Sequence, residues 1–240
     1  MKLLVSVGII LPFIFLARDT KAQSADSIVN NYVNAIGGKD SISKINTIYQ
    51  EASVSVMGTQ APDTIYIANG VGYKNIIGIN GQEIIQCYND SSGWTINPMG
   101  GSGDPTPVSQ QAYNDSKNEM NVGGALYNYA SKGYTVQLQG MEMVDSVNAY
   151  KLLLTEQDSI QVTYYIDPHT FYILKMIGQG EMQGSQVQVT VNYSDYRKTD
   201  SGIVMPYQYD IVLGNFDLAY TINTIKFNMP MDPSIFAMPK

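Results

Sequence analysis

The sequence predicts a mainly β fold (α+β class) built on an antiparallel sheet, and three observations support this. Apolar and polar residues alternate along many segments, turn signals separate most of these segments at short spacing, and no crossover helices join them. Alternation is typical of a strand with one face on a core and the other in water. Strands without crossover helices are joined as hairpins, so we expect roughly ten strands and no parallel sheet.

The alternation is clearest in four segments: 48–56, 160–166, 187–193 and 218–222. In the first of them, Val54 and Val56 alternate with serines. Turn residues separate the segments, and Asn80-Gly81 is a strong hairpin signal. We find no internal repeat and no linker that divides the chain, so residues 23–240 are predicted to form one domain.

A helix is predicted at the start of this domain. Apolar residues recur at helical spacing from Ile28 to Ile36, Asp26 is the expected N-cap, and Gly37-Gly38 provides a stop. Residues 40–45 are expected to add a short second helix. The apolar stripe of the first helix requires a partner surface, for which the sheet is the candidate.

The middle of the chain interrupts the strands. Residues 98–107 are rich in Gly and Pro and are predicted to be a loop, and residues 108–132 have helical or irregular character. A long insertion of this kind in a meandering sheet is expected to act as a lid or plug. In the tail, prolines prevent a central strand, and Ile235 and Phe236 are expected to tuck against one end of the sheet.

Residues 1–22 have the pattern of a secretory signal peptide, with cleavage expected between Ala22 and Gln23. The alternative is a membrane anchor, but the apolar run covers only residues 3–16, and a spanning helix needs roughly 20 residues. No Cys follows the run to accept a bacterial lipid anchor. We therefore expect a soluble periplasmic protein with no transmembrane segment after cleavage.

The charge balance excludes some partners. The chain has 14 basic and 21 acidic residues, a net charge of −7, and three of the basic residues lie in the leader. Nucleic acid is not an expected partner, because its binding needs basic patches. Anionic lipid headgroups also favour clustered Lys and Arg. Cys87 is the only cysteine, so no internal disulfide forms, and we expect it to be buried and inert.

The residues give little support for catalysis. His169 is the only histidine, and it lies in a turn where exposure is expected. Zinc sites built on several His or Cys residues are excluded, and Asp195, Asp210 and Asp217 stand beside turn residues. We therefore expect no enzyme activity, no catalytic residue, no metal and no cofactor.

The remaining hypothesis is a protein that binds an apolar ligand in a hollow. The chain is rich in Tyr and Met for its length, with 18 and 12 residues, and both residue types are suited to apolar, adaptable binding surfaces. The alternative is that they fill an ordinary core.

Three stretches together resemble a known family. The first is residues 87–98, in which Gly93-Trp94 precedes Asn97-Pro98; the second combines residues 149–152 with 163–170; the third runs from residue 194 to 207 and is closed by residues 236–239. Residues 35–39 fit as well. The chain is similar to the exported proteins named for outer-membrane lipoprotein sorting, relatives of the LolA/LolB lipoprotein carriers, over nearly all of residues 23–240.

The resemblance implies a strongly curved, incomplete β-barrel of about eleven strands, with helices covering its apolar concave face. It implies a hollow for acyl chains of lipoproteins or other lipids, and transfer partners at the inner or outer membrane. In the carriers an arginine inside the hollow holds the lid closed; the one arginine after the leader here is Arg197, near a strand end.

The leading hypothesis is thus a non-catalytic periplasmic carrier or chaperone for acyl-bearing cargo. The alternative is an exported interaction or sensor module whose hollow is filled by its own helices. The candidate ligand-binding residues are Val54, Val56, Trp94, Leu126, Tyr127, Tyr129, Val187, Val189 and Val191.

Overall fold

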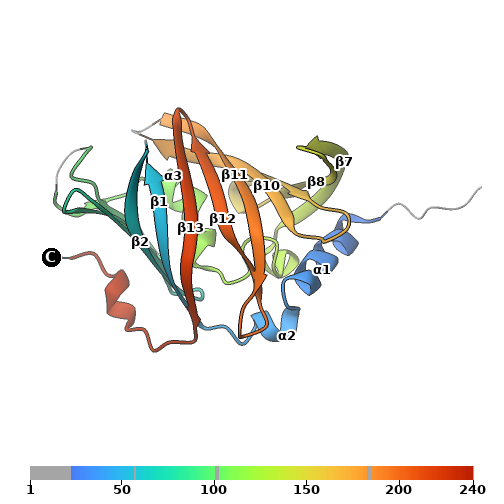
Figure 1. The fold of residues 1–240 in the computed structure, drawn as a ribbon, viewed down its shortest axis with the longest axis horizontal. Coiled ribbons are helices and arrows are strands. Elements are labelled where there is room, and N and C mark those ends of the chain that lie inside the picture. The colour runs from blue at the N-terminus through green and yellow to red at the C-terminus, as the bar shows by residue number, and fades with distance from the viewer. Residues whose placement is uncertain (1–22, 57, 101–102, 183–184, 240) are drawn as a thin grey trace, which may run out of the picture.

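The structure is a computed structural model that describes residues 23–56, 58–100, 103–182 and 185–239. Its strands form one 13-stranded sheet in the order β6-β5-β4-β3-β2-β1-β13-β12-β11-β10-β9-β8-β7, and all the neighbouring strands pair antiparallel. Figure 1 shows that the sheet bends around the helices without closing. The prediction of an open, curved antiparallel sheet is confirmed. The predicted leader and its cleavage site lie outside the described residues.

The strands are β1 Thr47–Val56, β2 Thr59–Ala68, β3 Gly72–Ile79, β4 Gln82–Asn89, β5 Gly93–Ile96, β6 Thr106–Pro107, β7 Thr135–Val144, β8 Val147–Thr155, β9 Gln161–Ile166, β10 Ile173–Met182, β11 Ser185–Lys198, β12 Val204–Leu213 and β13 Phe216–Phe227. The helices are α1 Ala25–Ala35, α2 Lys39–Ile42, α3 Gln110–Ser116 and the 3-10 turns η1 Lys117–Met120, η2 Tyr129–Lys132, η3 Gln157–Ser159 and η4 Pro233–Phe236. The expected strand number was too low, partly because the two-residue β6 lies within the segment predicted as a loop.

The strand register places an unbroken apolar row across the concave face. Residues directly opposite each other on neighbouring strands point to the same face. Following the pairs from β1 to β7 gives Val56, Leu218, Ile211, Val191, Met176, Tyr164, Leu152 and Leu138. The alternation seen in the sequence therefore corresponds to one continuous apolar inner surface.

Helix α1 begins two residues earlier than the sequence indicates. Its N-cap is Ser24, whose Oγ accepts from the backbone N of Ser27 at 3.2 Å, and Asp26 lies in the first turn instead. An acidic residue there still interacts favourably with the helix dipole, which is why Asp26 resembled a cap in the sequence. Helix α2 covers Lys39–Ile42, so it begins one residue before the predicted segment 40–45 and stops three residues before the end of that segment.

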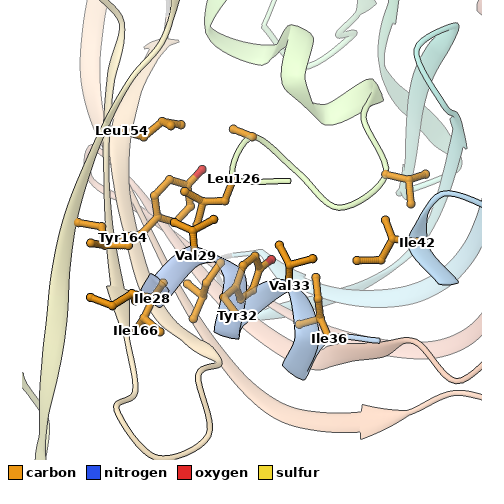
Figure 2. Packing of buried hydrophobic residues seen from close by; sticks show 14 of the residues in the cluster. Ile28, Val29, Tyr32, Val33, Ile36, Ile42, Leu126, Leu154, Tyr164 and Ile166 are labelled. Carbon is orange, nitrogen blue, oxygen red and sulfur yellow. The ribbon is translucent and has the colours of Figure 1, made fainter. Parts of the chain in front are cut away.

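The largest core fills one half of the concave side. Helix α1 presents Ile28, Val29, Tyr32 and Val33 to strands β8 and β9, and Leu126 from the insertion packs against them (Figure 2). Ile28, Leu152, Leu154 and Ile166 have no exposed surface. The prediction that the opening helix covers the sheet is confirmed. We call this part of the concave side the α1 half.

The C-terminal tail packs on the opposite, convex face. Phe236 is 1% exposed and lies in a cluster with Ala68, Ile85, Cys87 and Trp94. A Cβ on Gly72 would come within 2.6 Å of the Phe236 ring, so glycine there permits the contact. The tail is thus fastened to the sheet as expected, and Cys87 is buried, which raises the pKa of its thiol to about 12.

No helix in the described ranges combines the length and the apolar character that a membrane crossing needs.

Candidate functional site

The concave side has a second half, whose core contains only strand residues in the described part of the chain. There Ala52, Val54, Ala61, Tyr220 and Ile222 form a small buried cluster. Around it, Val56, Ile77, Ile79, Ile211 and Leu218 are only partly buried, and we call these five residues the basin. Strands β1, β3, β12 and β13 supply them, near the hairpins that join β1 to β2 and β12 to β13. Accessible aliphatic side chains on an inward-facing sheet surface are the feature expected of a site for a hydrocarbon guest.

A row of tyrosines crosses the sheet beside the basin. Tyr220, Tyr209 and Tyr193 are cross-strand neighbours on β13, β12 and β11. The first two rings stack with centroids 4.8 Å apart, and Tyr209 and Tyr193 are 6.3 Å apart. Burial raises the pKa of all three phenols, so they stay protonated at neutral pH. The row gives the concave face aromatic area together with hydroxyl donors.

Polar side chains separate the two halves of the concave side. Gln50, Asp63 and Asn75 on β1, β2 and β3 are each at most 7% exposed, and we call them the polar belt. Asn75 Nδ2 donates to Asp63 Oδ1 at 2.6 Å. Among the described residues, Asp63 Oδ2 is buried without a hydrogen-bond partner. Burial raises the pKa of Asp63 to about 7, and hydrogen bonds from Asn75 and the Thr64 backbone offset only part of this effect.

Glu119 on η1 faces the same region from the side of the insertion. Its side chain is exposed to solvent, yet burial raises its pKa to about 7, and a hydrogen bond with Tyr73 partly offsets the rise. The Glu119 carboxyl therefore keeps contact with solvent although protein surrounds much of it. Tyr73, Tyr193 and Tyr209 likewise keep some accessible surface although burial raises their pKa.

The insertion that was predicted as a lid has two parts. Its second part is fixed: Leu126 is 1% exposed in the α1 half, the backbone N of Val122 donates to Asn69 Oδ1 at 3.0 Å, and the Tyr129 hydroxyl bonds to Asp26. This part is a plug.

Helix α3, the first part, has no buried residue. Polar contacts hold it: Ser109 Oγ donates to Glu181 at 2.5 Å, Gln186 Nε2 donates to Asp115 at 3.3 Å, and the Tyr113 hydroxyl donates to the Asn89 carbonyl at 3.2 Å. Glu181 and Gln186 lie on β10 and β11, so polar contacts rather than a buried apolar face attach α3 to the sheet.

Removing two of these contacts is expected to loosen α3 alone. Each exposed hydrogen bond contributes about 0.5–1.5 kcal/mol, so Glu181→Ala with Gln186→Ala should accelerate amide exchange in residues 112–116 about tenfold. Hydrogen–deuterium exchange read by mass spectrometry checks this, with residues 122–134 as the internal control. Equal acceleration in both segments would show that the cover moves as one piece.

Two clefts lie near the site in the described residues, and neither covers the whole basin. One of about 370 Å³ runs along the seam between α1 and residues 126–131, where Val29, Val33 and Leu126 line it. The other, of about 550 Å³, lies at the ends of β1, β12 and β13, where two basin residues border it; its lining is Ser55, Gly58, Asp210, Ile211, Val212, Asp217, Leu218 and Ala219. The seam shows where the plug meets the helix.

The structure brings five of the predicted ligand-binding residues onto one face. Val54 and Val56 on β1 and Val187, Val189 and Val191 on β11 all lie on the concave side by register. Leu126, Tyr127 and Tyr129 belong to the plug in the α1 half. Trp94 lies elsewhere: it is 2% exposed on the convex face, where its Nε1 donates to the Phe236 carbonyl at 3.1 Å.

The polar belt and Glu119 were not found from the sequence. Asp63 stands at the second of four alternate positions, Ala61, Asp63, Ile65 and Ile67, and a single acid on an otherwise apolar strand face is a signal that the sequence contains. Glu119 carried no such signal, because η1 has no apolar period that marks its inward side.

Other candidate groups lie on the surface. Arg197 is exposed, pairs with Asp195 and lies 4.6 Å from the Tyr207 ring, so it does not reach the hollow as the resemblance to the carriers would require. His169 is exposed in its turn, as expected.

Neither protein-family models nor curated proteins match this sequence. Solved structures do share its fold. A DUF1329 family protein from Desulfovibrio piger is 16% identical, with a TM-score of 0.58 over 90% of this chain and 98% of that one. A LolA superfamily protein from Nitrosomonas europaea is 14% identical, with a TM-score of 0.58 over 90% and 98%. A Vibrio parahaemolyticus domain named for outer membrane lipoprotein sorting is 10% identical, with a TM-score of 0.57 over 88% and 97%. The chain therefore has the fold of LolA superfamily proteins, as the resemblance implied.

Proposed function

We propose that this protein is an exported, non-catalytic carrier that holds acyl chains of lipids or lipoproteins against the basin, with α3 as the movable part of its cover. In this proposal the leader directs the chain to the periplasm, where residues 23–240 act as one soluble domain. Cargo is received from, or passed to, lipoprotein-transfer proteins of the inner or outer membrane.

The observation that carries the proposal is the basin itself. Val56, Ile77, Ile79, Ile211 and Leu218 point inward yet keep accessible surface, while the same face is solidly packed under α1. Each CH₂ group that leaves water contributes about 0.8 kcal/mol, so a long acyl chain on such a surface needs no catalytic group to be held. The fold shared with LolA superfamily proteins supports the same reading.

Neighbouring residues of β12 provide a matched test. Ile211 belongs to the basin, whereas Val212 points to the convex face and is 37% exposed. Ile211→Asp is expected to weaken binding of an uncharged fluorescent acyl probe at least tenfold, about 1.4 kcal/mol, because a charge replaces an apolar contact. Val212→Asp should bind as the wild type does.

Titration of the refolded, delipidated protein gives the affinities, and native mass spectrometry of protein taken from the periplasm identifies resident lipid. Equal losses in both variants would indicate a general effect on folding. No binding by the wild type, together with a lipid-free native mass, would rule out the carrier function.

The filled α1 half favours one second candidate, an interaction module. Val29, Val33 and Leu126 occupy the space that an open carrier would leave empty there. Such a module would act through its surface, and the strand β7 at one edge of the sheet offers Met141 and Met143, 48% and 59% exposed. It predicts that Ile211→Asp and the wild type are equally free of lipid.

A further inference from the structure

We infer that the polar belt and Glu119 form a binding site for the ammonium group of an aliphatic amine, whose hydrocarbon chain extends along the basin. This inference rests on the proposed function and adds to it a preference for cationic amphiphiles over neutral or anionic ones of the same chain length.

Asp63 supplies an unused acceptor inside the molecule. It is 2% exposed, and its neighbours on the concave face are Ala52 across the strand pair and Ala61 two residues earlier. Its Oδ1 is taken by Asn75, while Oδ2 has no partner in the described part of the chain. An unpaired buried oxygen costs free energy, so a donor that reached it would be bound favourably. Ala52 and Ala61 end at Cβ, so neither of these two neighbours places a bulky side chain over the Asp63 carboxyl.

Asp63 also stands where the basin begins. Its register partner on β3 is Ile77, and Ile79 continues along the same face towards the hairpin that ends β3. A ligand whose polar group binds Asp63 would therefore place its hydrocarbon chain along apolar side chains. That combination fits an amphiphile rather than a small polar solute.

Glu119 provides a second carboxyl within electrostatic range of the same groups. Apart from burial, the pKa values of Tyr73, Tyr209 and Tyr220 are raised by the charges of both Asp63 and Glu119. The two acids therefore act on one shared region from the sheet and from the insertion. Aromatic faces of tyrosine also attract a cation, which adds to the preference.

Among the described residues, no Lys or Arg side chain is one of the groups that set the pKa values of Asp63 and Glu119. Lys117 lies two residues before Glu119 on η1. The other titratable groups that act on these acids or on their tyrosine neighbours are phenols and one further acid: Tyr73, Tyr88, Tyr193, Tyr209, Tyr220 and Asp115. An ammonium, with three N–H donors, would supply the missing positive charge. A fatty acid carboxylate would meet like charge instead.

Proton balance follows from this. A carboxyl that is protonated before binding gives its proton to solvent when the ammonium arrives, and a carboxylate–ammonium pair remains. Amine binding should therefore release protons and strengthen as pH rises from 5 to 8, while binding of an uncharged ligand should not.

The test compares dodecylamine, dodecanol and dodecanoic acid on the full protein at pH 7. We expect the amine to bind at least tenfold more tightly than the alcohol, and the acid most weakly. Calorimetry in buffers of different ionisation enthalpy measures the proton release. Asp63→Asn and Glu119→Gln should each reduce the amine affinity about tenfold and leave the alcohol affinity unchanged; Glu83→Gln, an exposed acid at the start of β4, is the matched control.

The outcomes separate the two proposals. If all three ligands bind equally well and the acid variants change nothing, the amine site is wrong and the carrier function stands. If none binds to the wild type, the carrier function fails as well. An amine preference that Glu83→Gln removes as effectively as Glu119→Gln would reduce the effect to general surface charge and overturn the site.

Discussion

Replacing Asp63 by Asn is expected to raise the free energy of unfolding by about 4 kcal/mol at pH 8 and to leave it nearly unchanged at pH 4. Burial raises the pKa of Asp63 from 3.8 to about 7 in the folded protein. Each unit of such a shift corresponds to about 1.4 kcal/mol. Asn has the same shape and can still accept from Asn75, so only the charge is lost.

The sign follows from proton binding. Between pH 4 and 7 the folded protein holds a proton on Asp63 that the unfolded chain has released, so wild-type stability falls as pH rises through this interval. Below pH 4 both states are protonated, and the wild type and variant should coincide. The contribution of Glu119 is common to both proteins and cancels in the comparison.

Urea titrations of both proteins at several pH values give the measurement. The difference in unfolding free energy should open between pH 4 and 8 and then level off. A constant difference across this range would mean that Asp63 is not held in a desolvating environment. The amine site would then lose its buried acceptor too.

Replacing Phe236 by Ala is expected to destabilise the protein by about 3–5 kcal/mol, the usual cost of removing a buried phenylalanine side chain. Its ring is 1% exposed and packs where Gly72, Cys87 and Trp94 leave space for it. The backbone carbonyl of the same residue accepts from Trp94 Nε1, so loosening the tail also removes that partner.

Trp94 is the only tryptophan in the chain and reports this change directly. Phe236→Ala should shift its emission to longer wavelength before the sheet unfolds, and denaturant titration gives the loss of stability. Met238→Ala, 41% exposed in the same tail, is the control and should leave both readouts unchanged. An unshifted emission in Phe236→Ala would show that the tail does not cover Trp94 in solution.

The strand pattern could be predicted because alternation of residue types is a local signal. In segments 48–56 and 187–193, the apolar residues that alternate in the sequence lie together on one face of the sheet. What could not be predicted is which segments pack against which face. Trp94 lies in an apolar stretch like Val54, and only the tail carrying Phe236 decides that Trp94 belongs to the convex side.

Only part of the site could be predicted from the sequence, for a similar reason. The valines of β1 and β11 were identified because apolar strand residues are natural candidates for a greasy surface. Asp63 becomes significant only when Asn75 and the uncompensated oxygen are seen together, which depends on pairing between β2 and β3. The plug formed by Leu126 likewise depends on contacts with Val29 in α1, far away in the sequence.

The polar attachment of α3 has a thermal consequence. Because no residue of this helix is fully buried, lifting it from β10 and β11 would exchange hydrogen bonds with protein for hydrogen bonds with water and expose little hydrocarbon of the helix itself. Exposing hydrocarbon is what gives a conformational change a large heat capacity. The heat capacity change of opening should therefore report how much of the apolar concave face lies under α3, and hardly at all the helix itself.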